Sequence, residues 1–339
     1  LRRAASPADL SHPAMAVNLD ACIQCNRCQR ACRDVQVNDV IGLAFRGAHT
    51  QVVFDLADPM GASSCVGCGE CVQACPTGAL MPKSHMGPQK VDREVDSVCP
   101  FCGVGCLVTY QVRDEKIVSV KGREGPANEG RLCVKGRFGM DYIHSPDRIT
   151  KPLIRKAGVA KDVSLLDGHT DWREVFREAT WEEALNLATE PLNALRQQHG
   201  PKSLAGFGSA KGSNEEAYLF QKLVRTGFGS NNVDHCTRLC HASSVAALME
   251  GLGSAVVTNP LRDVEQAELI FVIGANPAQN HPVGASWIKN AVENGNVAAQ
   301  IWWTKTQLGW KEQIHVSVPG SEPGGRSSSS GLGAVCLTL

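Results

Sequence analysis

The stretch Cys22-Ile23-Gln24-Cys25-Asn26-Arg27-Cys28-Gln29-Arg30-Ala31-Cys32 decides the fold of the amino-terminal part of the chain. Its spacing, C-x2-C-x2-C-x3-C, recurs at Cys65, Cys68, Cys71 and Cys75, where Pro76 follows. A third set comprises Cys99, Cys102 and Cys106, with Cys133 after an interval of 26 residues. Because these sets take twelve of the fifteen cysteines, we expect residues 22–133 to be organised around them.

The first two runs have the spacing of bacterial ferredoxin runs, in which the fourth cysteine ligates the other of two [4Fe–4S] clusters. This rule predicts one cluster held by Cys22, Cys25, Cys28 and Cys75, and a second held by Cys65, Cys68, Cys71 and Cys32. Disulfides are disfavoured because the sequence shows no secretory signal and such thiols stay reduced inside cells. Zinc is disfavoured because its tetrahedral sites usually use two C-x2-C pairs.

The third set predicts a further [4Fe–4S] cluster held by Cys99, Cys102, Cys106 and Cys133, with a four-cysteine zinc site as the alternative. Val108, Tyr110 and Val112 alternate with polar residues, and Ile117–Val120 follows a polar turn, which predicts a β-hairpin over this cluster. Lys135 comes two residues after the last thiol, where an ammonium can lie between an anionic cluster and a second anionic group. A solvated surface lysine is the alternative interpretation.

Length and composition indicate two or three domains with real hydrophobic cores, since the chain has 339 residues and is 43% hydrophobic. The 34 basic residues equal the 34 acidic ones, so composition gives no electrostatic footprint for nucleic acid. The sequence contains no run of 18 apolar residues, so we expect no membrane span. The many cysteines without evident pairing indicate a reducing compartment, and we expect a cytoplasmic location.

From Thr180 the pattern becomes α/β. Capping boxes at Thr180 and Ser213 predict two helices, the first with a kink at Pro191, and 203–208 reads as a short buried strand. The apolar run Leu269–Ile273 predicts a central parallel strand that leads into Gly274, Asn276, Pro277, His281 and Pro282. Ligands of open α/β sheets bind at the carboxyl ends of such strands, which places a nucleotide-type ligand at this loop. A plain strand-to-loop turn is the alternative.

A second chemical stretch lies at residues 234–245. Ser243 is a candidate N-cap, which puts Cys240 and His241 just before a helix N-terminus, where the dipole favours a thiolate. A soft thiolate beside an imidazole suits a transition-metal ligand with a neighbouring proton acceptor. The alternatives are core packing of Cys236 and Cys240, or zinc held by these cysteines with His235 and His241.

The order of these motifs resembles the catalytic subunit of molybdenum-dependent, NAD-linked formate dehydrogenases in the molybdopterin oxidoreductase superfamily. The resemblance covers about residues 12–296 and rests on the paired cysteine runs, CPFCGVGC with CVKGR, HCTRLCHASSV and VIGANPAQNHPV. It implies a ferredoxin-like 2[4Fe–4S] α+β domain (12–90), a small β-rich [4Fe–4S] domain (93–150) and part of an α/β (Rossmann-like) molybdopterin-binding domain (151–296).

The resemblance also implies roles for single residues. Cys240 would ligate molybdenum or tungsten, His241 would orient formate or accept its proton, and Lys135 would lie between the third cluster and the pterin. The loop with Gly274, Asn276, Pro277, His281 and Pro282 would contact one molybdopterin guanine dinucleotide of a bis-molybdopterin guanine dinucleotide cofactor. Formate would become carbon dioxide, and a partner subunit with flavin and iron–sulfur groups would reduce NAD.

Two features depart from the family pattern. Family chains continue for several hundred residues with a second dinucleotide site and an active-site arginine, so we expect a truncated chain with little formate oxidation by itself. Residues 297–339 read as an atypical tail, with low complexity from Pro319 to Gly333. Relatives also often carry an amino-terminal [2Fe–2S] domain. The alternative function is another molybdopterin oxidoreductase, or a respiratory iron–sulfur subunit that acts only in electron transfer.

Overall fold

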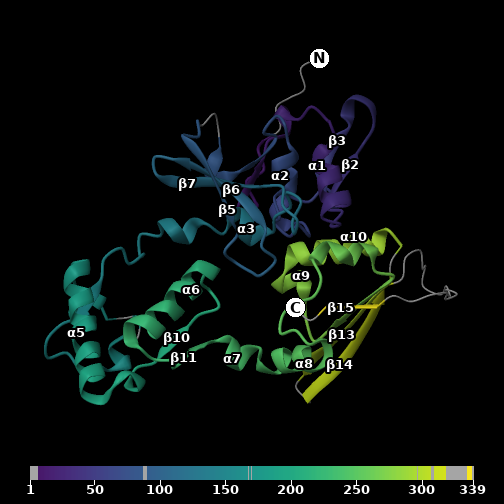
Figure 1. Ribbon diagram of the computed structural model, residues 1–339. Helices are drawn as coiled ribbons and strands as arrows, with labels where there is room; N and C mark the ends of the chain where they lie inside the picture. Colours follow the sequence, from purple (N-terminus) through teal and green to yellow (C-terminus); the bar gives the residue numbers. More distant parts are fainter. Residues whose placement is uncertain are drawn as a thin grey trace. The chain divides into compact units, whose positions relative to one another are not determined.

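The computed structural model describes residues 7–86, 90–166, 168, 170–295, 297–306, 309–317 and 334–337. The chain forms two compact units (Figure 1). The first unit comprises residues 1–144 and 259–339, and the second comprises residues 145–258. The molybdopterin-binding region expected over 151–296 is therefore divided between the two units. No helix in the described part of the chain is long and apolar enough to cross a lipid bilayer.

The amino-terminal part of the first unit wraps short elements around the two cysteine runs. Strand β1 (Met15–Val17) pairs antiparallel with β4 (Leu80–Pro82), which brings the segment before the first run beside the segment after the second. A hairpin of β2 (Ile41–Ala44) and β3 (Gln51–Phe54) lies between the runs. Each run contains a short helix, α1 (Arg27–Arg30) or α2 (Glu70–Ala74).

The third cysteine set is attached to an antiparallel sheet of three strands. The predicted hairpin is present as β6 (Leu107–Arg113) and β7 (Lys116–Gly122), and β5 (Arg93–Val98), which was not predicted, adds a third strand. Helix α3 (Val134–Phe138) begins directly after Cys133. Buried Val108 and Val120 pack with Cys99 and Cys106 in one core, so the sheet covers these cysteines as expected.

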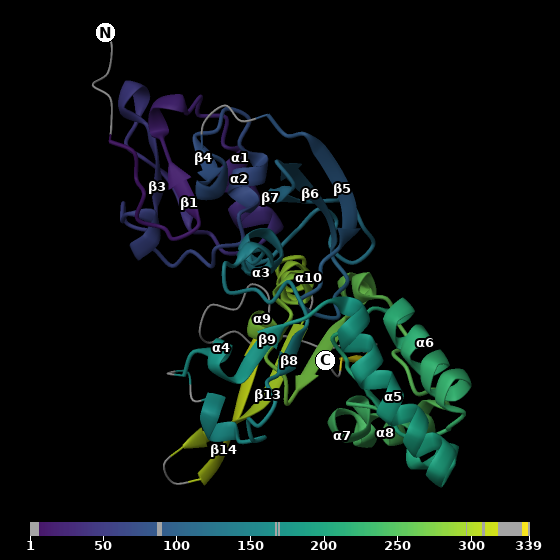
Figure 2. The same ribbon diagram turned by 90° about the vertical axis from the view of Figure 1, so that its left-hand side faces the viewer.

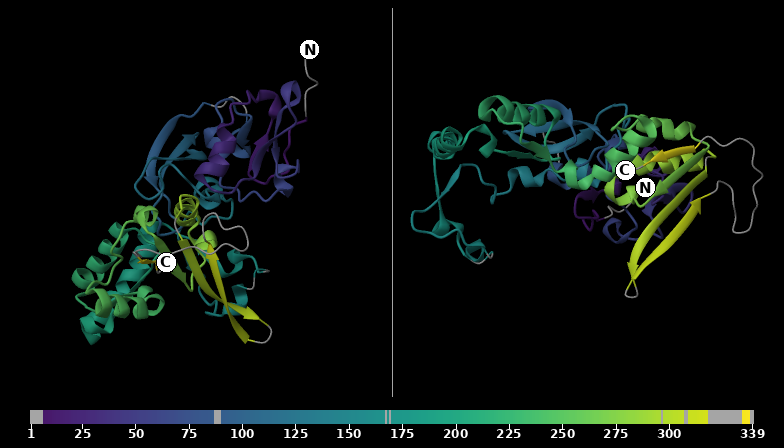
Figure 3. Two further views of the ribbon diagram at one scale, coloured as in Figure 1. Left: turned by 90° about the vertical axis from the view of Figure 1, so that its right-hand side faces the viewer. Right: turned by 60° about the horizontal axis from the view of Figure 1, so that its bottom comes forward.

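The carboxyl-terminal part of the first unit is a four-stranded sheet in the order β14-β13-β12-β15. Strand β12 (Leu269–Ile273) is central and pairs in parallel with β13 (Val297–Thr306) and β15 (Ala334–Leu337), as the apolar run predicted. Strand β14 (Gly309–Ser317) returns antiparallel to β13, and the two form a long hairpin (Figure 3). Parts of the expected atypical tail therefore extend the sheet, whereas residues 318–333 lie outside the described residues.

Two helices follow β12 in the chain, α9 (Pro277–Asn280) and α10 (Pro282–Glu293). Six residues of α10 are buried, from Val283 to Trp287 and at Ala291. The buried side chains of β12 pack with Ala291 in a separate core. Helix α10 therefore has one side against its own sheet and, as shown below, polar side chains that contact the cysteine-rich part of the same unit.

Within its described residues the second unit contains two pairs of short strands and five α-helices. Strand β8 (Leu153–Arg155) pairs antiparallel with β9 (Phe176–Glu178), and β10 (Gly206–Gly208) pairs in parallel with β11 (Val233–His235). The helices are α4 (Trp172–Val175), α5 (Trp181–His199), α6 (Asn214–Lys222), α7 (Thr237–Cys240) and α8 (Ala242–Leu252). Figure 2 shows the pair of β8 and β9 and the helices of this unit.

Several local predictions in the second unit need correction. The capping box is complete only at Ser213; at Thr180 the hydroxyl accepts from the Glu183 N–H, but the Glu183 carboxylate pairs with Arg177 instead. Helix α5 runs without interruption through Pro191, and the kink expected there stays a prediction. The strand expected over 203–208 is shorter and not fully buried, because Phe207 is 81% exposed.

The prediction of Ser243 as an N-cap is wrong. His241 is the N-cap of α8, without a side-chain capping hydrogen bond, and the helix ends at Leu252, with Gly253 as its C-cap at a positive φ of 73°. Glycine adopts this left-handed conformation without a steric penalty, so Gly253 suits the C-cap position.

Candidate metal centres

The first cavity of the amino-terminal part brings together Cys22, Cys25, Cys28 and Cys75. Its other walls are mainly apolar, with Leu19, Val52 and Leu80 among them, and it encloses about 380 Å³, part of which is open to solvent. Three of its cysteines come from the first run and the fourth from the second. The structure therefore places together the four residues that the ferredoxin rule predicts as one ligand set.

The second cavity has the reciprocal composition. Cys65, Cys68 and Cys71 come from the second run and Cys32 from the first, around a space of about 330 Å³ that includes open solvent. Phe54 and Met60 contribute apolar walls. Burial raises the pKa of Cys68 to about 12, and it raises the pKa of Cys71 well above its usual value. Since iron binds the thiolate, cluster binding at these thiols must release protons.

The loops of the two runs bend in the same places. In the first run Gln24 and Asn26 have positive φ angles of 54° and 59°, and the equivalent residues of the second run, Gly67 and Gly69, have 68° and 73°. These bends let backbone N–H groups face the sulfurs: Gln24 donates to Cys22 Sγ and Gly67 donates to Cys65 Sγ, both at 3.4 Å. Hydrogen bonds to sulfur stabilise the anionic form of a cluster.

A close contact gives a second reason why the residue at position 69 is glycine. A Cβ atom there would lie 2.1 Å from Cδ of Arg137, so any larger residue would collide with this side chain. The first run has no such neighbour at Asn26, where the side chain of an L-residue is tolerated in the left-handed conformation.

The third set also assembles. Cys99, Cys102, Cys106 and Cys133 are electrostatic neighbours: burial raises the pKa of Cys106 to about 12, and the other three thiols raise it further. The Cys99 N–H donates to the Cys106 carbonyl at 2.8 Å, which closes the loop between them. Lys135 is exposed on α3, two residues beyond Cys133.

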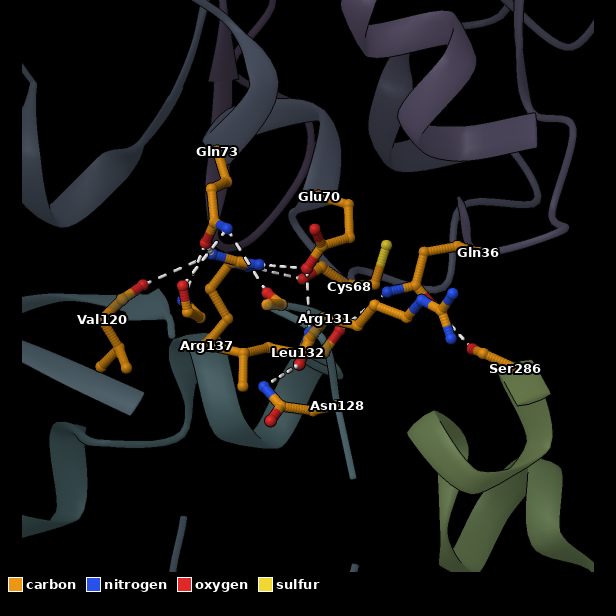
Figure 4. A network of polar contacts seen from close by, with 12 residues as sticks. Gln36, Cys68, Glu70, Gln73, Val120, Asn128, Arg131, Leu132, Arg137 and Ser286 are labelled. Atoms are coloured by element: carbon orange, nitrogen blue, oxygen red, sulfur yellow. Dashed lines mark hydrogen bonds and ion pairs between the residues drawn. The ribbon is translucent and has the colours of Figure 1, made fainter. Parts of the chain in front are cut away.

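A buried ion pair joins the second cavity to the third set (Figure 4). The side chains of Arg137 and Glu70 are 3% and 8% exposed and form a salt bridge. Arg137 Nε also donates to the Cys68 carbonyl at 2.8 Å, and Glu70 Oε1 accepts from the Leu132 N–H at 2.9 Å. Cys68 lines the second cavity and Leu132 precedes Cys133, so one ion pair holds a loop of each site.

Sequence reasoning missed this pair, together with Gln73. Gln73 Oε1 accepts from Arg137 Nη1 at 2.7 Å and from the Gly122 N–H at 2.8 Å. The one available signal was that both residues lie near ligand-spaced cysteines: Glu70 directly precedes Cys71, and Arg137 comes four residues after Cys133. That signal does not distinguish a buried charge from a solvated one.

The stretch with Cys240 and His241 follows a parallel strand. Strand β11 ends at His235, α7 ends at Cys240, and His241 joins α7 to α8. The side chains of both Cys240 and His241 are exposed, and so is Cys236, one turn earlier. His235 faces Thr237 instead, with Nδ1 2.7 Å from its hydroxyl. The loop therefore presents a thiol and an imidazole, adjacent in sequence, where an external group can reach them.

The zinc alternative for this stretch is not assembled. Within the described parts of both units, no three Cys, His, Asp or Glu side chains are arranged to hold a single metal ion. This includes His235, Cys236, Cys240 and His241. Core packing of Cys236 and Cys240, the other alternative, does not occur because both are exposed.

The loop after β12 has open space and an orphaned polar atom. Gly274 has a positive φ of 65°, and no atom lies within 4 Å of the position that a Cβ would occupy. Pro277 opens α9 and Pro282 opens α10, with Asn276 and His281 as the residues before them. His281 Nδ1 is buried without a hydrogen-bond partner in the described structure. An unsatisfied buried nitrogen in the segment that follows a parallel strand fits a polar ligand.

Comparison with known proteins identifies three consecutive domains. Residues 21–79 match the 4Fe-4S dicluster domain, residues 92–145 match the molybdopterin oxidoreductase Fe4S4 domain, and residues 148–315 match the molybdopterin oxidoreductase domain. The last match includes residues 297–315 of the expected atypical tail.

Individual relatives are similar over most of this chain. A protein of Bacillus subtilis (strain 168) named "Probable oxidoreductase" is 34% identical over 325 residues, which cover 84% of this chain and 31% of that protein. A Staphylococcus aureus (strain USA300) protein named "Putative formate dehydrogenase" is 34% identical over 311 residues, or 80% of this chain and 30% of that protein. The chain thus spans about a third of the length of these relatives.

Among solved structures, acetylene hydratase from Pelobacter acetylenicus matches 60% of this chain and 26% of its own, with a TM-score of 0.45 and 18% sequence identity.

Proposed function

Because the chain belongs to the molybdopterin oxidoreductase family, we propose that it forms the cluster-bearing part of a formate dehydrogenase catalytic subunit. In this proposal formate gives up a proton and two electrons to become carbon dioxide. The observation that carries the electron-transfer half is the exchange of one cysteine between the two runs, which builds two four-cysteine cavities of the kind that paired [4Fe–4S] clusters need. The proposal that formate is the substrate rests on relatives named putative formate dehydrogenase.

The cysteines give the proposed electron path an order. The third set is linked to the second cavity by Arg137 and Glu70, and Val134, next to Cys133, lies against Gly67 of the second run. The second cavity adjoins the first, since Cys28 and Cys71 are electrostatic neighbours. Electrons would therefore pass singly from the third set to the second cavity and then to the first.

When bound, molybdenum or tungsten with bis-molybdopterin guanine dinucleotide supplies the two-electron redox centre. We assign Cys240 as the metal ligand because its thiol is exposed after the carboxyl end of a parallel strand. His241, adjacent in sequence and also exposed, would orient formate or accept its proton. Lys135 would carry its exposed ammonium between the third cluster and the pterin.

The loop from Gly274 to Pro282 would contact one guanine dinucleotide. Its open space at Gly274 and the unpartnered His281 Nδ1 support this assignment. We further propose that a partner subunit with flavin and iron–sulfur groups accepts the electrons and reduces NAD, and that the enzyme works in the cytoplasm.

The test compares two exposed cysteines at the two ends of α7, the N-cap residue Cys236 and the last helical residue Cys240. In the enzyme that contains this chain, purified without oxygen, Cys240→Ala should abolish formate-dependent reduction of a viologen dye and leave the iron content unchanged. Loss of an outer hydrogen-bond partner of a metal ligand costs about 10–100-fold, and loss of the ligand itself should exceed this. The matched control, Cys236→Ala, should retain both activity and metal.

Two outcomes would contradict the proposal. Unchanged formate oxidation by Cys240→Ala would remove the ligand assignment. An enzyme with its iron but without molybdenum, tungsten or formate oxidation would instead favour the electron-transfer function.

A further inference from the structure

Lys289 of α10 lies beside the second cavity. Its ammonium donates to Asn38 Oδ1 at 2.8 Å and to the Val37 carbonyl at 3.1 Å. Asn38 lines the second cavity, and its N–H donates to the Cys32 carbonyl at 3.0 Å. Lys289 therefore contacts a residue that lines the cavity surrounded by four cysteines.

Helix α10 holds this lysine in place through neighbouring contacts. Ser286 donates to Gln36 Oε1 at 2.8 Å, one turn before Lys289 (Figure 4), and Asn290 donates to the Val35 carbonyl at 3.2 Å. Together these side chains bind residues 35–38, the segment that follows Cys32. A helix of the molybdopterin oxidoreductase domain thus supplies a cation to a site in the dicluster domain.

Three other charged side chains act on the thiols of this cavity, Glu70, Arg137 and Asp55, and they leave one net negative charge without Lys289. The Glu70 carboxylate and the Arg137 guanidinium, which pair with each other, act in opposite directions on the pKa of Cys68. The Asp55 carboxylate raises the pKa of Cys65, after the larger effect of burial. Burial lowers the pKa of Lys289 itself, whereas the thiolates of Cys68 and Cys32 raise it, and an anionic cluster would favour the ammonium further.

We propose that Lys289 is a positioning residue for electron transfer whose fixed positive charge raises the reduction potential of the cluster held by Cys32, Cys65, Cys68 and Cys71. This rests on the proposed function only in requiring that cluster, not in requiring formate as substrate. Reduction adds one electron to the cluster, and a nearby cation stabilises the more negative state. Net charge and hydrogen bonding around a cluster are among the properties that set its potential.

The experiment measures potentials rather than turnover. The 339-residue protein is reconstituted with iron and sulfide without oxygen, and cluster reduction is followed by electron paramagnetic resonance during a redox titration. Lys289→Gln keeps a donor for Asn38 and removes the charge, so one midpoint potential should become more negative. Lys289→Arg keeps the charge and should leave all midpoints close to those of the parent protein.

Two further variants identify the cluster and control for structure. Asp55→Asn removes the carboxylate that acts on Cys65 and should shift the same midpoint in the opposite direction. Lys83→Gln is the matched control, because Lys83 also donates to a backbone carbonyl, that of Leu10 at 2.6 Å, in the same unit. The three midpoints of this control should not move.

Three results would overturn the inference. Lys289→Gln could leave every midpoint unchanged, or Lys289→Arg could shift the same midpoint as far as Lys289→Gln does. Loss of iron in Lys289→Gln with retention in Lys289→Arg would assign the lysine to assembly of the loop. A shifted midpoint in the 339-residue protein, together with no formate oxidation by the enzyme that contains this chain, would support the inference while removing the proposed substrate.

Discussion

At the scale of single residues, the buried ion pair of Arg137 and Glu70 is the most consequential polar contact that the structure adds to the sequence. Both charges are almost fully removed from water and each satisfies further hydrogen bonds. Burial of an ion pair is weak evidence for net stabilisation, but removal of one partner leaves an uncompensated charge in a low dielectric. The pair therefore makes the two sites depend on each other.

We predict that Arg137→Met destabilises the first unit by about 3–5 kcal/mol, the usual cost of breaking a buried pair. Urea unfolding, followed by circular dichroism on the metal-free protein, measures the change. Arg177→Met is the control, because Arg177 pairs with Glu183 in an exposed bridge and should have little effect. An equal loss of unfolding free energy in both variants would contradict the expectation that breaking a buried ion pair costs more than breaking an exposed one.

Residue types and spacing predicted much of the candidate site. The ferredoxin rule predicted that Cys75 joins the first run and Cys32 the second, and the structure brings these residues together; metal binding at them stays a prediction. The charges around the cavities could not be predicted, because Lys289 is 257 positions from Cys32 in sequence and only tertiary packing brings it near. The spacing of cysteines along the chain predicts which thiols can bind one cluster. The positions of charges that are distant in sequence depend on the tertiary fold.

At the scale of elements, α10 is the helix that joins the parts of the first unit. Trp287 is fully buried, its Nε1 donates to the Ala127 carbonyl at 2.9 Å, and the Arg131 guanidinium lies 4.5 Å from its ring centroid. This contact holds the loop that leads to Cys133. Helix α10 therefore contacts the segments before Cys133 and after Cys32.

Trp287→Ala should cost about 3–5 kcal/mol of unfolding free energy, as is typical when a large buried aromatic side chain is truncated. It should also expose residues 123–131 to limited proteolysis, which mass spectrometry of the fragments can locate. Trp287→Phe fills most of the volume but lacks the N–H donor, so its loss should be smaller. Equal losses would mean that the hydrogen bond to Ala127 matters more than the packed ring.

Among elements, the uninterrupted run Leu269–Ile273 and the alternation before and after the 113–116 turn were sufficient to predict β12, β6 and β7. Strand β5 was missed because only its pairing with β6 identifies it: the residues of Arg93–Val98 are exposed or only partly buried. The capping box at Thr180 formed only in part because Glu183 had a competing partner in Arg177. Local patterns fail where a tertiary partner competes.

At the scale of the whole molecule, the exchange of Cys32 and Cys75 can be tested by counting iron. The 339-residue protein should bind about 12 iron atoms, four for each set. Cys75→Ala should lose the cluster of Cys22, Cys25 and Cys28, and Cys32→Ala should lose the cluster whose midpoint Lys289→Gln shifts. Redox titration of the two variants separates them. If Cys75→Ala abolished the Lys289-sensitive signal and Cys32→Ala spared it, each run would hold its own cluster.

The exchange of cysteines also has a consequence for synthesis on the ribosome. The wall of the first cavity is completed by Cys75, and the wall of the second by Cys71, four residues earlier. The cavity to which the first run contributes three thiols is therefore the last to obtain its fourth. A nascent chain that has released residues 22–32 holds only three thiols of one site and one of the other, and no iron-loading factor can finish either until the second run has emerged.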